Sequence, residues 1–479
     1  MTDVTSGQIL TSATVNAGDT LNVLSSGTVI DTTVLGTENV FNGGMAFNTV
    51  VEFGGVEEVF LGGLANNTNV GSGGIEKVEF GGTAIGTDVF GNGGEQDVDI
   101  GGTAIGTTVT LNGVQAVNSG GTASGTVVGF GGFEEVNFRG TAVDTFVGNG
   151  GKEHVNFGGT AIGTTVGGDG IEDVLSSGTT SGTIVNFGGE QDVEFGGTAI
   201  DTVVNGGGLE TISAIGTAIG TVVNGGFEVI SAFGTAIGTI VNGGFEIVHG
   251  TAIGTIVNLG GTESLAGGIA SGTIVNSGGH QDVLIGGTTV GTIVNSGGLE
   301  DVGNTGFASG TIVNLGGTEF VLNGGTARGT IVNSGGLEEV FAGGTASATT
   351  INGGTLEVAG GASISGPITF TSAGGILELD ASQSFHGTIA GFASPPGVTE
   401  EIDLRDISFG KKTKLSFKED KNHLSGTLTV TDGTHTANLT LLGQYSAQNF
   451  TLASDGFGGT MITDPAVGSG GHPVLAPSA

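Results

Sequence analysis

The chain has 479 residues, with 46 acidic and 10 basic side chains, a formal net charge of −36, no Cys and no Trp. The lack of a basic footprint excludes nucleic acid and anionic lipid as partners, and the lack of Cys excludes disulfides and thiolate-bound metals. No apolar run reaches the roughly 18 residues of a membrane-spanning helix, and 102 Gly residues without a strict every-third period exclude collagen.

A 19-residue phrase recurs between residues 13 and 349. Its anchor is the Thr of Thr-Ile/Val-Val-Asn, as in 183–186, and it begins 19 times, mostly 19 residues apart, with some steps of 16 to 18 and one of 20. A fixed period in this range indicates a stacked repeat architecture.

Three apolar positions recur in each copy. One copy places them at Val185, two residues after the anchor, at Val193, which closes a Gly-Gly-Glu/Gln unit, and at Ala199. Short arms separated by Gly or Asn fit strands with tight turns, and the Gly density excludes helices. The sequence therefore predicts an all-β parallel β-helix of about 19 rungs, one coil per copy, with Val and Ala inside.

One polar series in the repeat is an Asn position, which we expect to stack as a structural side-chain ladder. Its members are Asn186, Asn205, Asn224, Asn242, Asn258, Asn276, Asn295, Asn314, Asn333 and Asn352.

A second polar position is acidic. Carboxylates stacked at the rung spacing repel by about 0.9 kcal/mol per pair in bulk water, so we expect the series on a wet edge, as a solvated face. The alternative is a stripe of weak divalent-cation sites along Glu172, Glu210, Glu228, Glu246, Glu263, Glu300, Glu319 and Glu338. The same position holds Glu57, Glu76, Glu134 and Glu153, with Gln96, Gln115, Gln191 and Gln281 between them.

The composition changes after the repeats, because all six prolines and six of the ten basic residues lie beyond residue 362. We expect a repeat array at 1–362, a β-rich cap with an export determinant at 363–464, and a flexible tail at 465–479. Segments 427–431 and 437–442 alternate like half-buried strands, and a solenoid needs a cap over its last rung.

No catalytic or metal site is predicted. The seven histidines (His154, His249, His280, His386, His423, His435 and His472) lack ligand spacing, so we expect them on the surface. A carbohydrate-active β-helix enzyme, a lyase or hydrolase, is the alternative function. It needs clustered carboxylates near basic residues, whereas Lys77, Arg139, Lys152 and Arg328 lie far apart in the repeats.

The repeat of Gly-Gly-x-Glu/Gln-x-Val, Gly-Gly-Thr-Ala and Gly-Thr-Ile/Val-Val-Asn resembles the strand-loop-strand passenger repeat of AIDA-type and antigen-43-type autotransporter adhesins. The resemblance covers residues 10–360. It implies a right-handed β-helix outside a Gram-negative cell that mediates adhesion, with host-cell or bacterial-surface ligands or the chain itself as partners.

The resemblance also implies that a glycosyltransferase places heptose on Ser or Thr of the repeat. The matching positions are Thr183, Thr202, Thr221, Thr273, Thr292, Thr311, Thr330, Ser181, Ser271 and Ser309, for which structural strand threonines are the simpler interpretation. Neither an N-terminal signal peptide nor a C-terminal outer-membrane barrel is recognised. We therefore expect a secreted or surface protein that uses another exporter, such as a one-step system, or a passenger that has lost its translocator.

Overall fold

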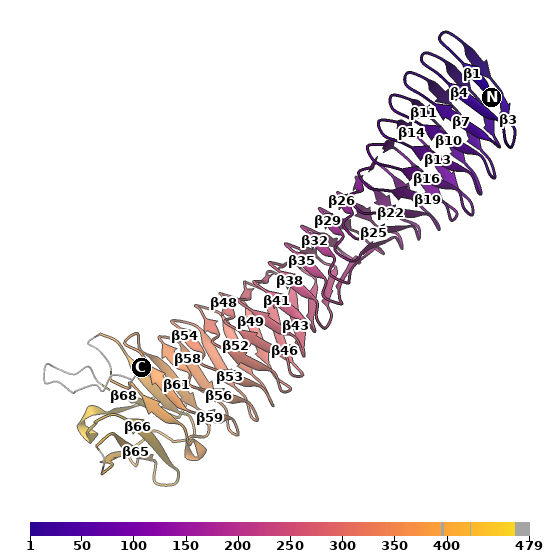
Figure 1. The fold of residues 1–479 in the computed structure, drawn as a ribbon. Coiled ribbons are helices and arrows are strands. Elements are labelled where there is room, and N and C mark those ends of the chain that lie inside the picture. Colours follow the sequence, from indigo (N-terminus) through magenta and orange to yellow (C-terminus); the bar gives the residue numbers. More distant parts are fainter. Residues whose placement is uncertain (394–396, 422, 465–479) are drawn as a thin grey trace. The chain divides into compact units, whose positions relative to one another are not determined.

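The computed structural model describes residues 1–393, 397–421 and 423–464, which are almost entirely β (Figure 1). Two short 3-10 turns, η1 (Ser382–Ser384) and η2 (Ala447–Asn449), are the helical segments among these residues. The chain divides into two compact units, residues 1–239 with 244–246, and residues 240–243 with 247–479.

In the first unit, each turn contributes one strand to each of three parallel sheets, which we name A, B and C. One turn consists of β10 (Val56–Val59) in sheet A, β11 (Leu64–Asn66) in sheet B and β12 (Asn69–Val70) in sheet C. These strands pair in parallel with β13 (Ile75–Val78), β14 (Thr83–Ile85) and β15 (Asp88–Phe90) of the next turn. The all-β parallel solenoid with a 19-residue turn is confirmed.

The inward side chains are the apolar residues that the repeat predicts. Val59, Ala65 and Val70 are at most 1% exposed, because alternate residues of a strand point to opposite faces. Glycine at the corners allows successive turns to approach each other closely. A Cβ on Gly55 would lie 2.1 Å from the carbonyl oxygen of Val34 in the preceding turn, so only glycine allows this close approach.

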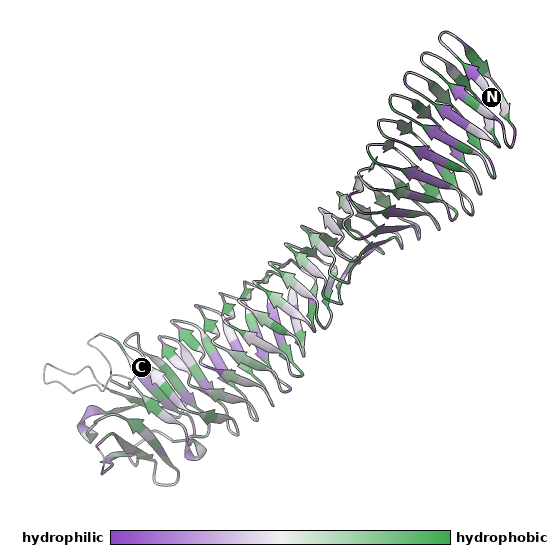
Figure 2. Cartoon of the chain, viewed as in Figure 1, coloured by the Kyte–Doolittle hydropathy of each residue, from purple (hydrophilic) through white to green (hydrophobic). Residues whose placement is uncertain are grey.

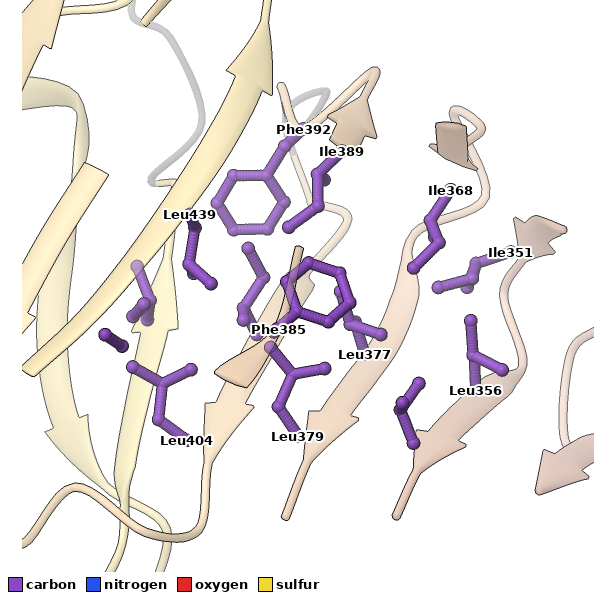
Figure 3. Close-up of a cluster of buried hydrophobic side chains, with 14 of the residues drawn as sticks. Ile351, Leu356, Ile368, Leu377, Leu379, Phe385, Ile389, Phe392, Leu404 and Leu439 are labelled. Atoms are coloured by element: carbon purple, nitrogen blue, oxygen red, sulfur yellow. The ribbon is translucent and has the colours of Figure 1, made fainter. Parts of the chain in front are cut away.

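The second unit repeats the same turn, for example β43 (Thr262–Ala266), β44 (Ile269–Ser271) and β45 (Ile274–Val275). Parallel pairing extends past residue 362, where we expected the array to end. In sheet A, β58 (Thr355–Val358), β61 (Gly375–Leu379) and β63 (Glu400–Leu404) pair in parallel. The interior of these last turns is filled by leucine, isoleucine and phenylalanine (Figure 3).

Antiparallel strands then cover the last turn. β63 pairs antiparallel with β68 (Thr460–Thr463), which also pairs with β67 (Thr451–Ser454). A meander is formed by β64 (Lys414–Glu419), β65 (Ser425–Thr431) and β66 (Thr436–Leu442), and β66 joins sheet C through β62 (Thr388–Ala390). The two segments predicted as strands lie in β65 and β66, and the tail predicted at 465–479 lies outside the described residues.

Candidate functional site

The acidic series of the repeat lies inside the solenoid. In each sheet A strand of four residues, the second and fourth side chains point inward, so Glu57 lies beside Val59 in β10 and is 0% exposed. The strand register places Glu57 directly above Glu76. The same burial holds for Glu134, Glu153, Glu172, Glu210, Glu228, Glu246, Glu263, Glu300, Glu319 and Glu338, and for Gln96, Gln115, Gln191 and Gln281. We call this set, with Glu38, the interior ladder.

The expected position on a wet edge is therefore wrong, and so is a cation stripe on an open face. Carboxylates occur at both inward and outward positions of these strands, as in Glu57 and Glu58. The alternation does distinguish them, because Glu57 is two residues from Val59, which is predicted to face inward, whereas Glu58 lies on the opposite face. The prediction was wrong because it treated every stacked carboxylate as charged and did not allow for protonation.

The anchor threonines donate hydrogen bonds to most members of the interior ladder. Thr68 Oγ1 donates to Glu57 Oε2 at 2.9 Å, and Thr164 Oγ1 donates to Glu153 Oε2 at 3.0 Å, in each case 11 residues along the chain. The glutamines connect successive turns, because Gln191 Nε2 donates to Glu172 Oε2 at 2.6 Å. These contacts satisfy polar groups that would otherwise be costly to bury.

Burial changes the protonation of the ladder. It raises the pKa of Glu38 to about 8 and that of Glu172 to about 7. Burial, followed by repulsion from Glu134 and Glu172, holds the pKa of Glu153 well above its usual value. A protonated carboxyl can donate a hydrogen bond to the next carboxylate, as between Glu153 and Glu172. The formal charge of −36 therefore overstates the negative charge of the folded chain near neutral pH.

The threonines proposed as glycan acceptors face this ladder. Thr183, Thr202, Thr221, Thr273, Thr292, Thr311 and Thr330 are at most 1% exposed. The fold closes their side chains off from a glycosyltransferase, so accessibility at these seven positions was wrongly expected. Ser181, Ser271 and Ser309 are different, because they are half-buried at the outward ends of β29 (Thr179–Ser181), β44 and β50 (Phe307–Ser309).

The three outward faces differ in chemistry. Sheet A carries the charge, with outward carboxylates such as Glu58, Asp97 and Asp173, and its strands in the first unit contain much of the purple in Figure 2. Most sheet B strands have three residues. The first, usually Thr, and the third, usually Ile, Val or Ser, point outward, and the residue between them is buried. Sheet C ends in the Asn ladder, in which Asn205 Nδ2 donates to Asn186 Oδ1 at 3.0 Å. The predicted Asn ladder is thus confirmed.

Exposed apolar side chains stand at the corners between the sheets of the first unit. Phe53, Phe187 and Phe233 are 80–81% exposed. The corner aromatics lie over the glycine of the following turn, because a Cβ on Gly207 would be 2.4 Å from the Phe187 ring. Glycine on the following turn therefore makes room for the exposed rings of Phe53 and Phe187.

The structure also brings together charges that are distant in sequence. Arg405 forms ion pairs with Glu357 and Glu378 on successive sheet A turns, and Asp380 and Asp403 lie within 4.0 Å of it. One guanidinium thus offsets the repulsion of stacked outward carboxylates. A separate pocket is lined by Val358, Ile364, Leu379, Phe385 and His386.

Comparisons with known proteins agree with the repeat. Residues 263–317 match the family described as adhesin of bacterial autotransporter system, probable stalk. No curated protein matches the chain. Among solved structures, the hyper-glycosylated TibA fragment made with TibC is 28% identical, covering 75% of this chain and 99% of that chain, with a TM-score of 0.27.

Two other solved structures are more distant. The tailspike protein of E. coli bacteriophage HK620 is 10% identical, covering 91% of this chain and 85% of that chain, with a TM-score of 0.18. An alginate lyase from Paenibacillus is 10% identical, covering 75% and 98%, with a TM-score of 0.11.

The fold defines a class, the β-solenoid repeat protein, and residues 263–317 of the chain match an adhesin stalk family. The repeats in this segment are similar to those of that family. Among the described residues, no helix is long and apolar enough to cross a membrane.

Proposed function

We propose that the chain acts as a multivalent adhesive stalk whose sheet B face contacts a host or bacterial surface, or a second copy of the chain. The observation that supports this is the strict register of sheet B, in which Thr160, Thr179, Thr198 and Thr217 follow one another on successive turns. Each is half-buried and points outward. A partner that binds one turn weakly meets the same contact on the next turn, and linked weak contacts give high avidity.

The test compares two faces of the same turns in the full chain. One variant replaces four sheet B threonines by Ala, at Thr160, Thr179, Thr198 and Thr217. The matched control makes the same change to Ala on the outward side of sheet C, at Thr165, Ile184, Val203 and Val222. Beads coated with each chain are counted on target cells. We expect the sheet B variant to lose at least tenfold and the control less than twofold. Equal losses, or full retention by the sheet B variant, would contradict the assignment of the face.

We also propose that a glycosyltransferase modifies the serines at the outward ends of sheet B strands. Support comes from their half-exposed position, shared by Ser124, Ser181, Ser271, Ser309 and Ser347. Peptide mass spectrometry after co-expression with a transferase of the TibC kind measures the sites. Sugar on these serines is the expected result, and sugar on the buried Thr183 would contradict it.

A further inference from the structure

His280, Asp282 and Asp301 converge on the outward face of sheet A in the second unit. His280 and Asp282 lie on β46 (His280–Leu284), and Asp301 lies on the paired strand β49 (Leu299–Val302), where it stands opposite Asp282. One nitrogen, His280 Nε2, is 3.3 Å from Asp282 Oδ1 and 3.0 Å from Asp301 Oδ2. One ligand atom from each residue lies within 4.8 Å of the other two.

These separations suit a small metal ion. Zn²⁺ binds imidazole nitrogen and carboxylate oxygen at about 2.0–2.1 Å in a tetrahedron, whose edges are then roughly 3.3–3.4 Å long. The two distances from His280 Nε2 are close to such edges. A Ca²⁺ ion fits less well, because it takes six to eight oxygen ligands.

The side chains of His280, Asp282 and Asp301 are partly shielded from water by their surroundings. The three side chains are 34%, 26% and 20% exposed, in the order His280, Asp282 and Asp301. Ser264 and Phe320 stand before and after the two aspartates in the register of this face. Asp301 Oδ1 is buried without a hydrogen-bond partner in the described part of the chain, so this acceptor has a lone pair available to a cation or its bound water.

We propose that His280, Asp282 and Asp301 form a binding site for a divalent transition metal of the Zn²⁺ type. Three protein ligands leave a fourth position open to water or to a donor from a partner. The imidazole distinguishes this site from the many outward carboxylates of sheet A, because borderline metals favour nitrogen donors.

The chain contains its own control. His154 Nε2 lies 3.0 Å from Asp173 Oδ2 on sheet A of the first unit, and both residues are similarly exposed. This pair has the same imidazole–carboxylate contact and does not belong to a three-donor group among the described residues. A site that needs all three donors should form at His280 and not at His154.

The experiment titrates the full chain with Co²⁺ and Zn²⁺ at pH 7.5 in the presence of millimolar Ca²⁺, which occupies nonspecific carboxylates. We expect one equivalent of Co²⁺ to give visible d–d absorption, to be displaced by Zn²⁺, and to bind at least tenfold more weakly in His280→Ala and Asp301→Asn. His154→Ala should bind as the natural chain does. Circular dichroism checks that each variant keeps its β structure, which is expected because the side chains point outward.

Two results would overturn the proposal. One is the absence of saturable, stoichiometric binding in the natural chain, which would leave the cluster as a His in polar contact with two carboxylates. The other is binding that survives His280→Ala or is lost equally in His154→Ala. Neither result bears on the adhesive function, which is measured with beads on cells.

Discussion

The interior ladder places carboxyl and amide side chains in the core, whereas the last turns of the solenoid place apolar side chains at the same positions. In the second unit, the register runs from Glu319 through Glu338 to Leu356, Leu377 and Ile402. The anchor position changes together with it. Thr349 donates to Glu338, whereas the next turn has Ile368 beside Leu356 (Figure 3). Carboxyl and hydroxyl are replaced as a pair, which indicates that they function as a pair.

The comparison teaches that parallel stacking itself does not require a polar interior. The same three sheets continue over leucine and isoleucine, and the apolar turns bury no carboxyl at these positions. The polar turns place a titratable group in the core of almost every turn. Their stability should therefore depend on pH, whereas the stability of the apolar turns should depend much less on it.

The largest expected effect is on stability between pH 5 and pH 8. Unfolded glutamates release their protons near pH 4.5, whereas Glu134, Glu172 and Glu210 keep theirs in the folded chain until about pH 7. The folded state thus binds more protons in this window. The contribution of these carboxyl groups to the free energy of unfolding is therefore fully present below pH 4.5 and is lost as pH rises through about 7. Each pKa unit is worth about 1.4 kcal/mol per carboxyl. We expect the melting temperature to rise steadily when pH is lowered from 8 to 5.

Hydrogen exchange, corrected for its intrinsic pH dependence, locates this effect. Protection should fall at pH 8 in the polar turns, as in β25 (Lys152–Val155), and change little in β60 (Pro367–Phe370) and β62. A uniform change along the chain, or a melting temperature that does not respond to pH, would refute the link between the ladder and proton binding.

The second largest effect is expected when a carboxyl group is introduced into the core of the apolar turns. Leu377→Glu places the group between Leu356 and Ile402, where the anchor position is Ile389 and offers no hydroxyl. We expect a loss of about 2–5 kcal/mol in the unfolding free energy of this region at pH 7, because the buried carboxyl lacks a partner. Urea unfolding measures it. Leu377→Met is the control for the change in shape, and equal midpoints for the two variants would contradict the prediction.

A smaller, opposite effect is expected when the first glutamate of the ladder becomes apolar. Glu38 is 0% exposed, and neither carboxyl oxygen has a hydrogen-bond partner in the described chain, while the preceding turn already has Leu21 at this position. Glu38→Leu should stabilise the first turns by about 1–3 kcal/mol at pH 8 and by less at pH 5. Glu58→Leu, on the outward face, is the matched control. Destabilisation by Glu38→Leu at pH 8 would show that this carboxyl is better satisfied than its geometry indicates.

The smallest effect concerns one threonine hydroxyl. Thr164→Val keeps the shape of the side chain and removes the hydrogen bond to Glu153, which should cost about 1–2 kcal/mol. Thr160→Val changes the outward threonine four residues earlier and should be nearly neutral. Local unfolding by hydrogen exchange in β25 compares the two. Equal effects would mean that the hydroxyl of the anchor threonine does not support the ladder.

Much of the fold could be predicted because it is local and repeated. The positions of Val185, Val193 and Ala199 relative to glycine determined the strands, their parallel stacking and the buried valines and alanines. The Asn ladder followed from the same register. The orientation of the acidic series was predicted wrongly. Glu57 shares a strand face with the inward Val59, but repulsion between charged carboxylates was expected to keep it out of the core, and burial instead raises the pKa of these groups.

The cluster at His280 was not predicted from the sequence, for a related reason. Its ligands are two residues and 21 residues away in sequence, a separation that matters only once one turn is stacked on the next. The sequence by itself determined the period, and thereby which residues recur at the same height of each turn. The tertiary structure decided which side of the sheet each recurring residue faces. Burial beside valines raises the pKa of a glutamate such as Glu172 to about 7, and this burial exists only after the chain has coiled.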